Sequence, residues 1–111
     1  MNAKDRIILF KIAGYIVEVA SYTRGMDFAG FSADTKTINA TAFVLGQIGE
    51  LANKVSEEIR IANPQINWKG MRGLRNRIVH DYENLDMKMI WSVISDDLPE
   101  LGTQMRDLLE K

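Results

Sequence analysis

The residues of this 111-residue chain best suited to acid–base chemistry lie in one short segment, RNRIVHDY (residues 75–82). It holds the only histidine, His80, five positions after Arg75 and two before Tyr82. Histidine exchanges a proton near neutral pH, and arginine stays charged and can stabilise a phosphate on which negative charge develops. Together they can support metal-free RNA cleavage, which needs a base for the ribose 2′-hydroxyl and an acid for the leaving 5′-oxygen. The competing interpretation is that His80 has no catalytic role, because a lone histidine near a helix end is usually a surface or packing residue.

Helix geometry limits how these side chains can cooperate. At 3.6 residues per turn, Arg75 and His80 lie about 140° apart around the axis and do not share a face. Asn76 is one i, i+4 step from His80, and Arg72 extends that row. Arg75 must therefore bend around the helix, or the turn at His80 must fray, or a second copy must supply the missing group. A twofold dimer would bring two histidines and two arginines to one cleft, one imidazole acting as base and the other as acid.

The charges near this segment are distributed unevenly. The net charge is −1, so the whole molecule has no basic field that would attract nucleic acid. No acidic residue occurs from position 63 to position 80, whereas four cations do: Lys69, Arg72, Arg75 and Arg77. This pattern predicts a local anion site in which Lys69 and Arg72 contact phosphates, with less support for Arg77. Solvated surface charge is the alternative for all three.

Apolar residues recur every three or four positions along most of the chain, which predicts helices, and no strand or hairpin pattern interrupts them. Stop and cap signals divide the pattern into four helices: residues 3–24 before Gly25, a long helix from Ser32 or Asp34 to a point before Pro64, a shorter helix capped by Asn67, and a fourth capped by Asp86. Because the connections are short, we expect an all-α fold, an antiparallel four-helix bundle in a single domain, residues 1–111. The third helix should face the core with Trp68, Met71, Leu74, Ile78 and Val79.

Three residues depart from good helix-forming sequence. Gly46 and Gly49 each cost roughly 1 kcal/mol relative to alanine, so we expect a backbone to pack closely against them. Pro99 removes the amide that would bond to the Ser95 carbonyl. The fourth helix should therefore kink there, or break with a new segment beginning at Ser95 or Asp96.

Composition excludes several classes of protein. With 46% hydrophobic and 26% charged residues, the chain can bury a core and is not of the disordered class. The absence of cysteine excludes disulfides, a thiolate nucleophile and a sulfur-based zinc site, and one histidine is too few for an ordinary zinc site. No metal or cofactor is expected, although a carboxylate-bound magnesium stays open. The first apolar run has only four residues before Lys11, so we expect no membrane association and a cytoplasmic location.

The segment RNRIVHDY resembles the R-x-x-x-x-H-x-Y signature of the HEPN superfamily, specifically the HepT-like toxins that pair with minimal nucleotidyltransferase antitoxins. The stretches LGQIGELANKVSEEI, PQINW, GMRGLRNRIVHDY and IWSVISDDLPEL are similar to the same family, so the resemblance covers about residues 35–101. It implies a four-helix bundle, usually a homodimer, and a metal-independent RNase whose signature pair corresponds to Arg75 and His80.

The resemblance also implies roles for three neighbours. Asn76 matches a polar residue expected to orient the histidine or the phosphate, and the alternative is an exposed helical asparagine with no role. Tyr82 matches the tyrosine that the partner nucleotidyltransferase modifies with adenylyl groups, an interpretation compatible with an aromatic ring packed at the helix end. Glu50 resembles a recurrent acidic position, and its role stays open, with pairing to a basic side chain the favoured account.

Three functional hypotheses follow. The leading one is an endoribonuclease toxin of a toxin–antitoxin system that leaves a 2′,3′-cyclic phosphate and a 5′-hydroxyl, neutralised by a nucleotidyltransferase antitoxin. The alternative is a non-catalytic nucleotide- or RNA-binding module that serves as scaffold and adenylylation substrate for that partner. A purely structural dimerisation bundle ranks last, because it leaves the acid-free cationic segment unexplained.

Overall fold

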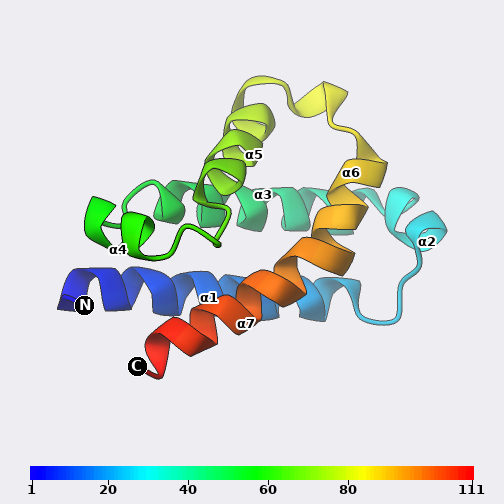
Figure 1. Ribbon diagram of the computed structural model, residues 1–111. Coiled ribbons are helices and arrows are strands. Elements are labelled where there is room, and N and C mark those ends of the chain that lie inside the picture. Colours follow the sequence, from blue (N-terminus) through cyan, green and yellow to red (C-terminus); the bar gives the residue numbers. More distant parts are fainter.

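The computed structural model describes residues 1–111 and contains helices but no strand (Figure 1). The elements in chain order are α1 (Ala3–Thr23), α2 (Phe28–Ser32), α3 (Thr35–Ala52), α4 (Glu57–Ala62), α5 (Trp68–His80), the 3-10 turn η1 (Tyr82–Asn84), α6 (Met87–Ser92), the π-helical turn η2 (Val93–Asp97) and α7 (Leu98–Leu109). The last three follow one helical path. The predicted all-α, four-helix architecture is confirmed.

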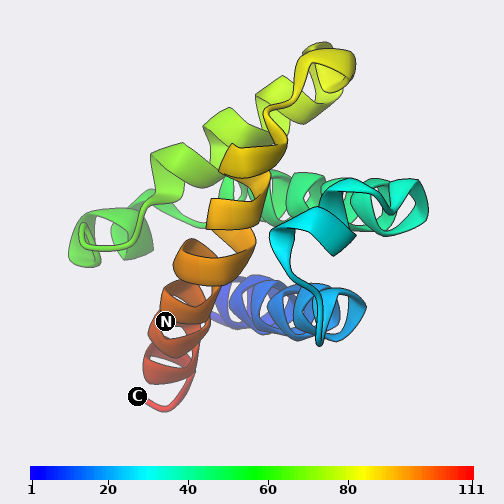
Figure 2. The same ribbon diagram turned by 90° about the vertical axis from the view of Figure 1, so that its right-hand side faces the viewer.

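Four helical segments make up the bundle: α1, α3, α5 and the α6–α7 path. Helix α3 packs against α1 on one side and against α5 on the other, and α7 crosses α1 (Figures 1 and 2). Both chain ends lie at the same end of α1, where the Arg6 guanidinium donates from Nη1 to the Leu109 carbonyl at 3.0 Å. Helix α5 therefore depends mainly on α3 for its position.

The core forms where α1, α3 and α7 meet. Its most completely buried members come from several elements: Leu9, Ile12, Val19, Phe31, Ile90 and Met105. From α5, Trp68 and Ile78 are buried as predicted, and Met71 and Leu74 are half-buried. The prediction for Val79 is wrong, because its side chain is 56% exposed. Its neighbour Ile78 takes the position that faces α3, and the next residue along a helix must point elsewhere.

Local cap signals were predicted correctly. Asp34, Asn67 and Asp86 accept hydrogen bonds from the first-turn amides of α3, α5 and α6 at 3.1, 2.9 and 2.9 Å. The bond from the Thr37 amide lowers the pKa of Asp34 below its usual value. Gly25 follows the end of α1 with φ of 77°, a conformation that favours glycine.

The long second helix was predicted wrongly. Helix α3 stops at Ala52, and α4 begins only at Glu57, after a break that contains Ser56. The Ser56 backbone amide and hydroxyl donate to the buried carboxylate of Asp5 at 2.9 and 2.6 Å. This tertiary contact stabilises the break between α3 and α4. Hydrophobic periodicity could not predict it, because the two residues are 51 positions apart.

The structure confirms close packing at Gly49 and an irregular stretch of helix next to Pro99. A Cβ atom on Gly49 would lie 2.4 Å from the Arg75 Cβ and 2.5 Å from the Met71 carbonyl oxygen, so α5 does pack closely there. The prediction for Gly46 is wrong, because a Cβ atom there would make only an ordinary contact, with the Ile78 side chain at 3.9 Å. Near Pro99 the irregularity is the π-helical turn η2, at whose end the Leu98 amide donates to the Val93 carbonyl, and the proline, which has no amide to donate, follows in the first turn of α7.

Candidate active site

The start of α5 is anchored by a chain of hydrogen bonds through buried polar groups. The indole Nε1 of Trp68 donates to the Asn63 carbonyl at 3.1 Å, and the Asn63 amide side chain donates to the Ile59 carbonyl at 2.9 Å. Both side chains are buried. Together with the Asn67 cap, these bonds fix where the helix that carries the RNRIVHDY segment begins.

The absence of a side chain at Gly49 sets the register between α3 and α5. Because α5 lies directly against this glycine, the next residue of α3, Glu50, comes alongside Arg75. At the other end of the pair, the Tyr82 hydroxyl donates to the Asn39 side-chain oxygen. The higher-numbered residue of this pair, Tyr82, thus contacts the lower-numbered residue of α3, so α3 and α5 run antiparallel.

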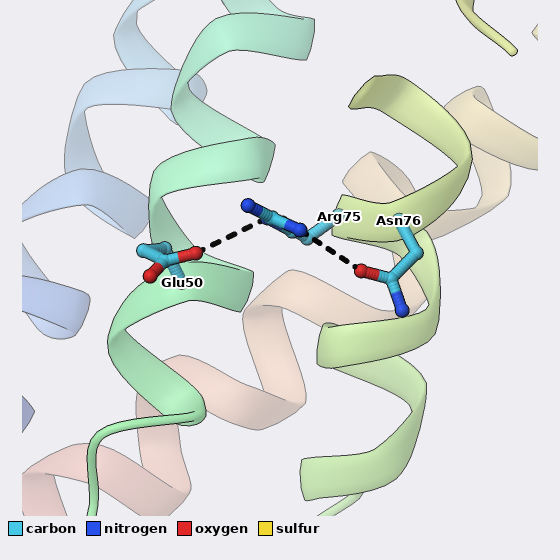
Figure 3. A network of polar contacts seen from close by, with 3 residues as sticks. All are labelled: Glu50, Arg75 and Asn76. Atoms are coloured by element: carbon cyan, nitrogen blue, oxygen red, sulfur yellow. Dashed lines mark hydrogen bonds and ion pairs between the residues drawn. The ribbon is translucent and has the colours of Figure 1, made fainter. Parts of the chain in front are cut away.

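Arg75 is held from two sides, as Figure 3 shows. Its Nε lies 3.1 Å from the Glu50 Oε2, and its Nη1 donates to the Asn76 side-chain oxygen at 3.1 Å. The Arg75 and Glu50 side chains are 34% and 38% exposed, so the pair remains accessible to a ligand. The guanidinium is therefore aimed by its neighbours and still has donor groups to spare.

These residues border a polar hollow of about 350 Å³ between α3 and α5. Its eight lining residues include no hydrophobic one: Gly49, Glu50, Asn53, Lys69, Arg72, Gly73, Arg75 and Asn76. Three are cations and one is a carboxylate, so the lining carries a net charge of +2 (3 − 1). The Arg72 Nε is buried and has no hydrogen-bond partner. The residues predicted to contact phosphates, Lys69 and Arg72, thus line the same hollow as Arg75 and Asn76.

The structure does not join His80 to Arg75. His80 is the last residue of α5, is exposed, and its imidazole makes no hydrogen bond. Helix geometry places it on an outer crest of α5 together with Lys69, Gly73 and Asn76, all of them exposed. Arg75 instead lies toward α3. The single chain therefore presents the two groups on different sides of one helix, as the sequence predicted.

Tyr82 lies just past α5, in η1, and the residue is 39% exposed. Its bond to Asn39 ties the loop after His80 to α3. Sequence reasoning missed Asn39, and no local signal points to a partner 43 positions away. For Glu50 it left the role open but favoured pairing with a basic side chain, and the ion pair with Arg75 confirms that pairing. The glycine before Glu50 was a usable signal for the partner, since a close approach at Gly49 places the next residue at the same contact.

Nowhere do three or more histidine, cysteine, aspartate or glutamate side chains gather as they do around metal ions. No helix combines the length and the apolar content needed to cross a membrane.

Comparison with known proteins gives a consistent result. A family model described as "Ribonuclease HepT-like" matches residues 12–108. The chain is 29% identical to "Probable ribonuclease HepT" of Thermococcus cleftensis, over 97% of this chain and 98% of that protein. It is also 29% identical to "Putative RNase MJ0127" of Methanocaldococcus jannaschii, over 99% and 92% of the two chains. "Putative RNase TTE0752" of Caldanaerobacter subterraneus is 30% identical over 79% of each chain. The comparison with solved structures gave no significant match.

Proposed function

This chain belongs to the Ribonuclease HepT-like family of the HEPN superfamily, and we propose that it is a metal-independent endoribonuclease, the toxin of a toxin–antitoxin pair. The observation that carries the proposal is the polar hollow. It places an aimed arginine, Arg75, beside Arg72, whose buried Nε has no partner, on the same helix as the chain's only histidine. A phosphodiester would supply acceptors for both guanidinium groups.

The proposed reaction needs no group from outside the protein and the RNA. One imidazole takes the proton of the ribose 2′-hydroxyl, and the 2′-oxygen attacks the neighbouring phosphorus. The bond from phosphorus to the 5′-oxygen breaks, and a second imidazole, already protonated, gives that oxygen its proton. The products are a 2′,3′-cyclic phosphate and a 5′-hydroxyl. Arg75 stabilises the charge on the phosphoryl oxygens, with Arg72 and Lys69 as phosphate contacts, and Asn76 orients Arg75 through the bond that they share.

The second imidazole would come from a second copy of the chain. Two exposed apolar side chains lie beside the site, Phe43 on α3 and Val79 on α5, 64% and 56% exposed. Both fall between the Glu50–Arg75 contact and the Asn39–Tyr82 contact of the antiparallel pair. A twofold axis through this surface would bury both residues and bring two copies of His80 toward one cleft.

The regulatory part of the proposal concerns Tyr82. Its hydroxyl is near the end of the helix that carries His80, and adenylylation would replace the proton that it donates to Asn39. The modification would add bulk and negative charge at the mouth of a cationic site, and both effects oppose RNA binding. A nucleotidyltransferase antitoxin is the proposed source of the adenylyl group.

Incubation of the purified protein with RNA in EDTA tests the chemistry. Cleavage should persist, should leave cyclic phosphate ends, and should fall by at least about 10³-fold in both His80→Ala and Arg75→Ala. Arg24→Ala removes an exposed arginine outside the site and is the matched control. Cleavage equally fast in all four proteins would remove Arg75 and His80 from the chemistry. RNA that is retained but never cut would favour the non-catalytic binding module.

Mass spectrometry after co-expression with a cognate nucleotidyltransferase tests the regulation. The adenylyl adduct is expected on Tyr82 and should vanish in Tyr82→Phe. Tyr15 and Tyr22 serve as internal controls, because both are more buried than Tyr82. An adduct confined to either of them would contradict the proposal.

A further inference from the structure

A second depression lies on the opposite flank of α5 from the Glu50–Arg75 contact. This apolar groove, of about 520 Å³, runs between α5 and the η2–α7 segment, with α3 as its floor. It exists because α5 packs against α3 and scarcely touches α6 or α7, and the α5 and α6 ribbons diverge in Figure 1. Its volume falls within the range of about 300–1,000 Å³ that is usual for small-ligand pockets.

The groove has an apolar interior and a polar rim. Eight of its 15 lining residues are hydrophobic, and four of these are half-buried side chains that a ligand can reach: Met71, Leu74, Met89 and Val93. Lys69 and Arg77 stand on the α5 wall, and neither makes an ion pair. Asp97 and Gln104 stand on the opposite wall. A flat ring with apolar faces and a polar edge, attached to an anion, fits this lining, and a nucleotide of single-stranded RNA has that chemistry.

The outer crest of α5 connects this groove with the polar hollow. Lys69 and Gly73 line both spaces. Gly73 and His80 are seven residues apart, so they share a face and lie about 10 Å apart along the axis. The proposed cut site and the groove are therefore reached from the same crest, at a separation suited to neighbouring nucleotides.

Gly73 has no explanation in the packing of the fold. A Cβ atom at this position would meet nothing within 4 Å, whereas one at Gly49 would collide with α5. A glycine inside a helix costs about 1 kcal/mol relative to alanine, so an open one lowers stability without improving packing. What it does provide is a low point on the crest, where another backbone can approach the helix closely.

We propose that the apolar groove binds one nucleobase of the RNA next to the cleaved bond, and that the strand reaches it by crossing α5 at Gly73. This inference rests on the proposed ribonuclease function and names how that site selects its substrate. Lys69 and Arg77 hold the phosphates on either side of the crossing, and Met71 and Met89 contact the base. Asp97 accepts hydrogen bonds from the base edge. Guanine presents two adjacent N–H donors to a carboxylate, so we expect guanine to be preferred and uracil disfavoured.

A pair of glycine variants tests the crossing. Gly73→Gln places a long side chain on the crest, and Gly14→Gln makes the same change at an exposed, open glycine inside α1. Binding is measured by fluorescence anisotropy with single-stranded 2′-O-methyl RNA, which lacks the attacking hydroxyl and cannot be cut. Gly73→Gln should weaken binding and slow RNA cleavage by about tenfold or more, while Gly14→Gln changes neither. Thermal unfolding should occur no lower in either variant than in the wild type, since both lose a helical glycine.

A second pair tests the base. Sequencing of the ends cut from a random RNA library should reveal a guanine preference at one position beside the cut. Asp97→Asn should reduce that preference, and Asp96→Asn, a change at a neighbouring exposed carboxylate outside the groove, should not.

These measurements separate failure of this inference from failure of the ribonuclease proposal. Wild-type protein that binds the uncleavable RNA in a Gly73-dependent way but never cuts RNA would overturn the ribonuclease proposal alone. Equal RNA binding by Gly73→Gln and Gly14→Gln would overturn the groove assignment. Loss of a nucleotidyltransferase complex in Gly73→Gln, with RNA binding intact, would also overturn it and assign the groove to a protein partner.

Discussion

Two carboxylates, Asp5 and Glu50, each connect segments that are distant in the sequence, but they do so in different surroundings. Asp5 is 2% exposed and accepts two hydrogen bonds from Ser56 at the start of α4. Glu50 is 38% exposed and pairs with Arg75 at the edge of the polar hollow. A buried, fully bonded carboxylate stabilises the fold strongly, whereas a half-exposed ion pair contributes little free energy. We therefore expect Asp5 to matter mainly for stability and Glu50 mainly for the proposed site.

The largest loss of stability is expected at the buried carboxylate. Asp5→Ala leaves the Ser56 amide and hydroxyl without their acceptor and should lower the free energy of unfolding by about 2–4 kcal/mol. Urea denaturation measures it, with Asp107→Ala, a change at an exposed carboxylate, as control. Below the unfolding transition, cleavage per folded molecule should be unchanged. A decrease in the free energy of unfolding of less than about 0.5 kcal/mol, the usual size for surface substitutions, would show that the Asp5 hydrogen bonds do not stabilise the fold.

The next effect is expected at the contact that brings Glu50 to Arg75. Gly49→Ala puts a methyl group within 2.4 Å of the Arg75 Cβ. Overpacking of this kind costs about 1–3 kcal/mol, only partly offset by the helix preference of alanine. Cleavage should also fall, because α5 must move away from α3. Gly14→Ala, at an open position of α1, should instead raise stability by up to about 1 kcal/mol. Equal stabilisation by the two changes would contradict the close packing.

A smaller change, of opposite sign, is expected at Thr41. This residue is fully buried, and its hydroxyl has no hydrogen-bond partner. Thr41→Val replaces the hydroxyl with a methyl group and should raise the free energy of unfolding by about 1 kcal/mol. The matched change Thr23→Val removes a hydrogen bond to the Val19 carbonyl and should give no gain. Thermal unfolding of the two variants checks whether a buried hydroxyl stabilises the fold only where it has a hydrogen-bond partner.

The smallest effect on stability is expected at Glu50 itself. Glu50→Gln should change the free energy of unfolding by less than about 1 kcal/mol, because the pair is half-exposed. Its effect should appear in catalysis. We expect kcat to fall about tenfold or more, because Arg75 is no longer held in position by Glu50. KM should stay the same or fall, because the hollow becomes more positive. Glu100→Gln, on the exposed face of α7, is the control. An unchanged kcat would show that Glu50 does not position Arg75.

The sequence predicted the features whose causes are local. Asn67 and Asp86 cap helices because each bonds to amides within three residues of itself. The RNRIVHDY segment could be recognised because its residue types and their spacing lie within eight consecutive positions. The break between α3 and α4 was not predictable in this way, because it depends on Asp5, 51 positions away. The partners of Arg75 and Tyr82 likewise depend on the antiparallel register of α3 and α5. Val79 was misplaced because the sequence alone does not distinguish an exposed apolar residue of a helix from a core residue.

We propose that two copies of the chain, each contributing His80, act on one phosphodiester. Mixing wild-type and His80→Ala subunits at fixed total concentration, with RNA in EDTA, tests it most directly. If one cleft needs both imidazoles and subunits pair at random, the cleavage rate should follow the square of the wild-type fraction, so an equal mixture keeps about a quarter of the activity. A linear decline that leaves about half, or unimpaired cleavage by His80→Ala alone, would contradict the account.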